Sequence, residues 1–115
     1  MAINFLSETN KMIESCGYSE SDIYFCQVEH YNYNTNTDDL IQFSYDFFKK
    51  FANFEYDNGY GIEQIPERMK IVFKDNSWIE RNTYDGSEWW EYKKTPVFNQ
   101  KNFVENPKIS LKKEY

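Results

Sequence analysis

The chain of 115 residues has few of the residue types from which catalytic and metal sites are commonly built. It contains one histidine and two cysteines, and it has no Gly-x-Ser-x-Gly turn and no phosphate-binding loop. A structural zinc site needs four Cys or His ligands, and this set does not complete one. We therefore expect no catalytic residue, no metal ligand and no cofactor, and we expect that the chain is not an enzyme.

Cys26 and His30 come nearest to a nucleophile and its base. If both lie on one strand, they share a face about 13 Å apart at about 3.3 Å per residue, which is too far for a thiolate and imidazole pair. The two cysteines, Cys16 and Cys26, are also too few for a disulfide framework. We expect both to be reduced thiols that fill small spaces in the core.

Long apolar runs are missing as well. No stretch approaches the roughly 20 apolar residues of a membrane helix. The opening MAINFLSETN turns polar after Leu6 and has no basic region before an apolar stretch, which does not fit a signal peptide. There is no internal repeat and no linker rich in Gly, Pro or Ser. We expect a cytoplasmic protein with one compact domain over residues 1–96 and a basic tail over residues 97–115 that is partly ordered at most.

Negative charge is abundant but unevenly distributed. Residues 93–115 contain six Lys and two Glu, a net charge of +4, while residues 1–92 contain seven basic and seventeen acidic side chains, a net charge of −10. An acidic body repels nucleic acid and is attracted to basic grooves, so we expect no direct nucleic-acid partner and no membrane partner. The simpler alternative is that the acidic side chains only keep a small domain soluble.

The periodicity predicts two helices with a strand between them. Apolar residues at three and four residue spacings predict a helix within residues 1–16, capped by Gly17. Alternation predicts a strand over residues 22–34. A second helix is predicted over residues 36–51, with Asn36 or Thr37 as its N-cap. Its apolar stripe is formed by Leu40, Phe43, Phe47 and Phe51.

From residue 69 the pattern predicts a β-meander. Its three runs are MKIVF, SWIERNTY and EWWEYKK, and they follow a turn or irregular loop within residues 52–66. Asp75 and Asn76 can close the first turn, which sets Phe73 opposite Trp78 and Val72 opposite Ile79. We therefore predict an α+β fold, with one antiparallel sheet of about four strands and two helices on one face.

The last turn leaves two registers open. Asp85-Gly86 favours a two-residue type I′ turn, because both of its central positions need a positive φ. That register pairs Arg81 with Trp90 and Glu80 with Glu91. A three-residue loop pairs Arg81 with Glu91 instead, which replaces two like charges by a salt bridge.

The last hairpin resembles a group of small phage and prophage proteins of Gram-positive bacteria. These proteins carry a Trp-(Leu/Ile)-Glu-Arg stretch, then Tyr-Asp-Gly-Ser-Glu-Trp-Trp-Glu, then Lys and Pro. The matching residues are Trp78, Ile79, Glu80, Arg81, Tyr84, Asp85, Gly86, Ser87, Glu88, Trp89, Trp90, Glu91, Lys93 and Pro96. Thr83 stands where the group usually has an acidic residue. The resemblance implies a phage origin, and small acidic phage proteins are often inhibitors of host defence, anti-CRISPR proteins among them.

Trp89 and Trp90 are consecutive, so on a strand they point to opposite faces and do not share one core. Which of the two is exposed stays open, and the second can also pack under the loop of residues 52–66. An exposed Trp between Glu88 and Glu91 fits an aromatic interface anchor with an acidic rim. We predict that charge and anchors at the partner surface come from Asp38, Asp39, Asp46, Glu80, Tyr84, Asp85, Glu88, Trp89, Trp90 and Glu91.

These features favour an inhibitor of bacterial defence, most concretely an anti-CRISPR protein that acts in the cytoplasm of the bacterial host. Its expected partner is a protein with a basic nucleic-acid-binding groove, such as a CRISPR effector nuclease, and its oligomeric state stays open. One alternative is a module that stacks its rings on a nucleotide signal, with Arg81, Lys93 and Lys94 as cations. Another is a single-strand nucleic-acid binder, which the acidic body disfavours.

Overall fold

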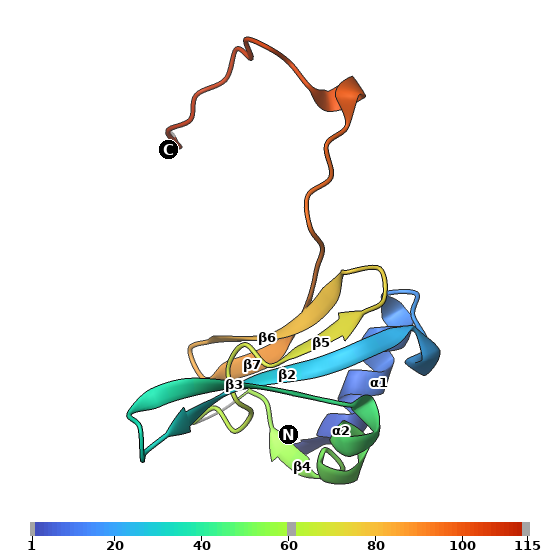
Figure 1. The fold of residues 1–115 in the computed structure, drawn as a ribbon, viewed down its shortest axis with the longest axis vertical. Helices are drawn as coiled ribbons and strands as arrows, with labels where there is room; N and C mark the ends of the chain where they lie inside the picture. The colour runs from blue at the N-terminus through green and yellow to red at the C-terminus, as the bar shows by residue number, and fades with distance from the viewer. Residues whose placement is uncertain (1, 60–61, 114–115) are drawn as a thin grey trace.

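The fold is known from a computed structural model that describes residues 2–59 and 62–113. A five-stranded antiparallel sheet in the order β3-β2-β5-β6-β7 forms its body (Figure 1). Its strands are β2 (Ile23–Asn32), β3 (Thr37–Phe43), β5 (Lys70–Phe73), β6 (Trp78–Tyr84) and β7 (Ser87–Lys93). A second sheet pairs β1 (Ala2–Asn4) with β4 (Glu55–Asp57). The helices are α1 (Phe5–Ser15) and α2 (Tyr45–Phe51), with 3₁₀ turns η1 (Glu20–Asp22) and η2 (Gln100–Asn102). The α+β class is confirmed, and the sheet has more strands than the four expected.

The first helix forms as predicted. The Asn4 side chain caps its N-terminus by accepting a hydrogen bond from the backbone N–H of Ser7. At the other end Gly17 has φ +87°, and the N–H groups of Gly17 and Tyr18 donate to the last turn of the helix. That is a Schellman end, in which glycine adopts the left-handed conformation without the steric cost of a Cβ.

The helix predicted over residues 36–51 is wrong in its first half. Residues 37–43 form β3, which pairs with β2 from Cys26 opposite Phe43 to Asn32 opposite Thr37. Only α2 is helical, and its cap is Ser44, whose hydroxyl accepts from the N–H of Phe47. Neither Asn36 nor Thr37 caps a helix, because seven cross-strand residue pairs with β2 offer this segment more contacts than an isolated helical turn would.

The loop expected within residues 52–66 contains a short strand. β4 pairs with β1, and its central residue Tyr56 is buried in the core. Tyr60 and Gly61, which belong to the turn-forming EYDNGYG motif, lie outside the described residues.

The register of the first meander turn differs by one residue from the prediction. Val72, not Phe73, lies opposite Trp78. The connection is a three-residue loop over residues 74–76, and Asn76 has φ +70°. Asn tolerates the left-handed conformation that closes a loop of this length.

The second meander turn has the two-residue register, with Tyr84 opposite Ser87. Asp85 and Gly86 have φ values of +51° and +86°, as a type I′ turn requires. Glu80 therefore lies opposite Glu91, and the three-residue alternative is wrong.

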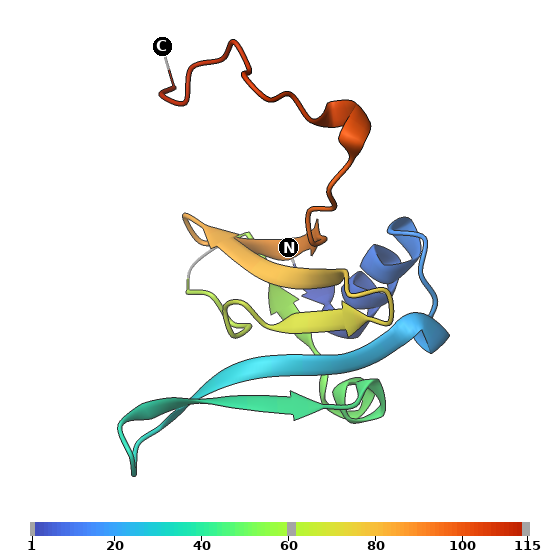
Figure 2. The ribbon, with the colours of Figure 1, turned by 45° about the horizontal axis from the view of Figure 1, so that its top comes forward.

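Both helices pack on one face of the large sheet, as predicted, and the core lies between them and the sheet (Figure 2). The Phe5 ring of α1 lies 5.8 Å from the ring of Trp90 on β7 and 5.5 Å from that of Phe48 on α2. We call this helix-covered face of the sheet the inner face and the opposite face the outer face.

The tail after β7 runs away from the body of the protein (Figures 1 and 2). Its apolar residues Phe103 and Val104 are 62% and 59% exposed, so they are not docked on the body. Within the described residues, no helix has the length and apolar character needed to cross a membrane.

Candidate functional site

The β6–β7 hairpin places five of the predicted partner-binding residues close together. Tyr84 and Asp85 lie at its tip, where the Tyr84 side chain is 76% exposed. Glu80, Trp89 and Glu91 lie on the outer face, because they alternate with the buried residues of the same strands.

Trp89 and Trp90 point to opposite faces, as predicted. The Trp90 indole is 6% exposed, stacks on Phe5 and donates from Nε1 to the hydroxyl of Thr9 at 3.0 Å. Trp89 is half-buried on the outer face and donates from Nε1 to Glu91 at 3.2 Å. Trp89 is therefore the tryptophan of this pair that a partner can reach.

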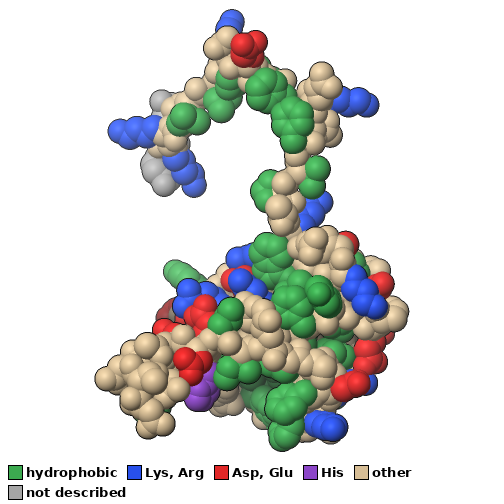
Figure 3. Space-filling view, in the orientation of Figure 1, with side chains coloured by type: hydrophobic (Ala, Val, Ile, Leu, Met, Phe, Trp, Pro, Cys, Tyr) green, Lys and Arg blue, Asp and Glu red, His purple; other side chains and the backbone are tan. Residues whose placement is uncertain are grey.

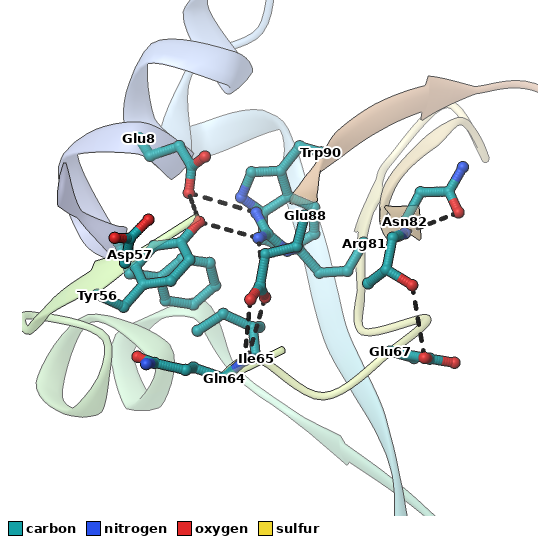
Figure 4. Close-up of polar contacts among 12 residues, drawn as sticks. Glu8, Tyr56, Asp57, Gln64, Ile65, Glu67, Arg81, Asn82, Glu88 and Trp90 are labelled. Atoms are coloured by element: carbon teal, nitrogen blue, oxygen red, sulfur yellow. Dashed lines mark hydrogen bonds and ion pairs between the residues drawn. The ribbon is translucent and has the colours of Figure 1, made fainter. Parts of the chain in front are cut away.

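The inner side of the hairpin holds a buried charged cluster around Arg81 (Figure 4). Its guanidinium donates to Glu8 at 3.3 Å, to the hydroxyl of Tyr56 at 2.9 Å and to Glu88 at 3.4 Å. The rings of Phe5, Tyr56 and Trp90 surround its Cζ at 5.1 to 5.7 Å. Carboxylates and ring faces replace the water that the guanidinium of Arg81 loses on burial.

Glu88 completes this cluster. Its two carboxylate oxygens accept hydrogen bonds from the backbone N–H groups of Gln64 and Ile65 at 2.9 and 3.1 Å. Its own N–H donates to the carbonyl of Asn58. These hydrogen bonds join the hairpin to the segment before β5. Glu88 is 2% exposed, so like Trp90 it is not part of the accessible surface.

Tyr56 connects the cluster to the second sheet. Its hydroxyl accepts from Arg81 and donates to Glu8 on α1. Burial, and then the hydrogen bond to Glu8, raise the pKa of this phenol above its ordinary value, so it remains a donor. The cluster thereby joins α1, β4, β6 and β7 and connects the hairpin to the body.

The outer face shows how the like-charged pair Glu80 and Glu91 is tolerated. Lys70 and Lys93 lie 3.8 and 3.4 Å from the carboxylate of Glu80, and Trp78 donates to it from Nε1 at 3.0 Å. Hydrogen bonds from Asn82 and then Trp89 lower the pKa of Glu91. Each carboxylate therefore has its own donors, which offsets the repulsion that disfavoured the two-residue turn.

Figure 3 shows hydrophobic side chains gathered over the strands, with acidic and basic side chains among them. On β6 and β7, half-buried Trp78 and Trp89 flank the two carboxylates of the outer face. We call Trp78, Glu80, Tyr84, Asp85, Trp89 and Glu91 the hairpin surface.

Asp38, Asp39 and Asp46 do not join the hairpin surface. Asp38 and Asp39 lie on β3, and Asp39 accepts a hydrogen bond from the Asn32 side chain. β3 and β7 are opposite edges of the sheet, about four strand spacings or 19 Å apart. Asp46 lies on α2, 3.5 Å from Lys49. These three acidic residues contribute to the field of the body rather than to one site.

The charged cluster was not predicted from the sequence, where Arg81 was expected opposite Trp90 or Glu91 in the hairpin, or as a cation beside a nucleotide. One signal was available. Arg81 is two residues from Ile79, and Glu88 is two residues from Trp90, so each charge shares a strand face with an apolar residue, and both were assignable to the buried face of neighbouring strands. Glu8 and Tyr56 come from distant segments, and no local pattern identifies them.

Among residues 2–59 and 62–113, no three His, Cys, Asp or Glu side chains are grouped so that they could hold a metal ion. No protein-family model, curated protein or solved structure matches the chain.

Proposed function

We propose that this chain is a binding protein of phage origin that inhibits a bacterial defence nuclease, most specifically as an anti-CRISPR protein. In this proposal the hairpin surface occupies a basic groove on the nuclease and excludes nucleic acid from it. The observation that carries the proposal is that Tyr84, Asp85, Trp89 and Glu91 are presented together on a hairpin held from behind by the buried pair of Arg81 and Glu88.

A rigid support matters because binding costs less when the contact residues are already in place. Tyr84 and Trp89 offer wide, stiff contact areas, which is typical of interface anchors. Asp85 and Glu91 add negative charge beside them, and the body of charge −10 steers the protein toward positive surfaces. The phage origin rests on the resemblance of the hairpin sequence.

The alternative of a nucleotide-binding module has less support. It needs a cation beside the exposed rings, but Arg81 is 1% exposed and is paired with carboxylates on the inner side. Lys93 is on the outer face, where it pairs with Glu80. Lys94 follows at the end of the hairpin, away from the tip that carries Tyr84.

The proposal is tested with a purified guide-loaded nuclease of a bacterial host and a fluorescent target duplex. We expect the wild-type chain to displace the duplex. The double variant D85N/E91Q should compete at least about tenfold less well, since it loses two negative charges while Asn tolerates the left-handed turn position and Gln can still accept from Trp89.

The matched control is E14Q/E20Q, which removes two negative charges at exposed positions of α1 and η1, near the end of the sheet opposite the hairpin tip. It should compete almost as well as the wild type. Equal losses in both variants would show that only net charge matters. Nucleases for the assay can be captured from bacterial lysate on the immobilised protein. If the wild-type chain displaces the duplex from none of them, the inhibitor proposal is refuted.

A further inference from the structure

An apolar groove of about 190 Å³ opens beside α2. Its lining includes Phe43, Phe47, Phe51, Phe54, Ile65 and Met69, and we call it the α2 groove. The rings of Phe43, Phe47 and Phe51 follow one another at centroid distances of 5.4 and 4.6 Å. Phe47, Phe51 and Phe54 are 50%, 65% and 41% exposed. An apolar patch of this kind, contiguous and open, is typical of an interaction site.

The tail carries a second apolar feature. Val97, Phe98, Phe103 and Val104 are between 59% and 86% exposed, and we call them the tail knob. The knob is locally folded. The 3₁₀ turn η2 is capped by the Asn99 side chain, and the rings of Phe98 and Phe103 lie 5.7 Å apart. The knob is therefore a preformed aromatic unit that its own body does not cover.

The tail knob does not cover the α2 groove of its own chain, since the tail runs away from the body (Figures 1 and 2) and the apolar residues of the knob stay exposed. β7 and β3, which supplies Phe43 to the groove, are opposite edges of the sheet, about 19 Å apart in a straight line through the core. α2 and the origin of the tail lie at opposite ends of the body (Figure 1), so the path over the surface is longer still.

We propose that the tail knob of one chain docks in the α2 groove of a second copy, so that two chains exchange tails in a dimer. Charge favours this pairing, because a tail of charge +4 approaches a body of charge −10. Beside the groove, the exposed Glu55 and Glu67 follow the groove residues Phe54 and Pro66, and the exposed cations there are Lys50 and Arg68, of which Arg68 is paired with Glu29. The exposed Lys101 lies between Phe98 and Phe103 and would meet this rim.

The apolar area is sufficient for such a dimer. A large aromatic side chain buries about 150 to 250 Å² when it is covered, and Phe98 and Phe103 are still 73% and 62% exposed. Two reciprocal contacts cover four such rings and a similar area of groove, on the order of 1,000 Å² in total, which is the lower size of specific interfaces. This dimer uses a surface separate from the hairpin surface and does not depend on the proposed function.

Sedimentation equilibrium of the full chain over a wide concentration range tests the proposal. We expect a reversible dimer for the wild type. The tail variant F98D/F103D changes residues outside the folded body and should raise the dimer dissociation constant more than about tenfold. The matched control I109D/L111D places the same two charges at exposed apolar positions beyond the knob, and it should dimerise like the wild type.

The groove is tested by F51D, because the Phe51 side chain is 65% exposed and its loss leaves the core intact. F51D alone should be as weakly dimeric as F98D/F103D. An equimolar mixture of the two variants retains one intact knob and one intact groove, which is one of the two contacts, so it should associate more weakly than the wild type but more strongly than either variant alone. A wild-type chain that remains monomeric, a dimer that survives F98D/F103D, or a mixture that associates no more strongly than each variant alone would each overturn the exchange of tails.

Discussion

The guanidinium of Arg81 lies 3.4 Å from the carboxylate of Glu88, and both side chains are 1% exposed. The two residues stand on neighbouring strands on either side of the Asp85-Gly86 turn. Arg81 also has one buried donor, Nε, without a hydrogen-bond partner among the described residues. A buried ion pair is not by itself a large source of stability, but removing one partner leaves an uncompensated charge in the core.

Replacing Glu88 by Ala should therefore be among the most destabilising single changes in the chain. Arg81 loses a counter-ion, and the N–H groups of Gln64 and Ile65 lose their acceptor. We expect a loss of about 3 to 5 kcal/mol in the free energy of unfolding, measured by urea denaturation. E91Q on the outer face is the control and should cost less than about 1 kcal/mol. Similar costs for both variants would show that the cluster does not hold the hairpin.

The parts of the fold that the sequence predicted well are those that local chemistry decides. Gly17 has the backbone freedom that a helix end needs, and Asp85-Gly86 provides the two positive φ values of its turn. Alternation along β6 and β7 fixed which residues share a face, so the opposite placement of Trp89 and Trp90 followed directly.

The parts that failed depend on contacts between distant segments. Residues 37–43 carry Asp38 and Asp39 where a helix favours acids, and Leu40 and Phe43 at a helical spacing. The pairing of residues 37–43 with β2 overrides this local helix preference. The sequence of the segment itself does not indicate that pairing. The site shows the same limit, since Arg81 meets Glu8 only after α1 has packed on the sheet.

Cys26 should be inert to thiol reagents while the protein is folded. Its side chain is 0% exposed, and burial raises the pKa of its thiol to about 12, so almost no thiolate forms at neutral pH. In the variant C16S, which retains Cys26 as its one thiol, we expect no reaction with DTNB at pH 8 and full reaction in guanidinium chloride. Rapid labelling without denaturant would contradict the burial of Cys26.

Asp75 should make the fold sensitive to acid. Hydrogen bonds from Ser77 and then from the Tyr18 hydroxyl lower its pKa in the folded state. The resulting stabilisation is present above the unfolded pKa of about 3.9 and is lost as the pH falls through the lower folded value. Urea denaturation should show D75N to be less stable than the wild type at pH 7, and the two should converge as the pH drops below about 4. S77A, which removes the hydroxyl donor, should show the same trend more weakly. Parallel curves for wild type and D75N would contradict the prediction.

The two adjacent tryptophans should respond very differently to the same substitution. W90F removes the Nε1 hydrogen bond to Thr9 and leaves space beside Phe5 and the Arg81 guanidinium. We expect it to lower the free energy of unfolding by about 1 to 3 kcal/mol, because a buried hydroxyl loses its donor and the core loses volume. W89F changes a half-buried residue of the outer face and should cost less than about 1 kcal/mol. Urea denaturation compares the two stabilities, and in the competition assay, without denaturant and at a temperature where both variants are folded, only W89F should weaken binding. If W90F weakened competition and W89F did not, the partner would not bind the outer side of the hairpin.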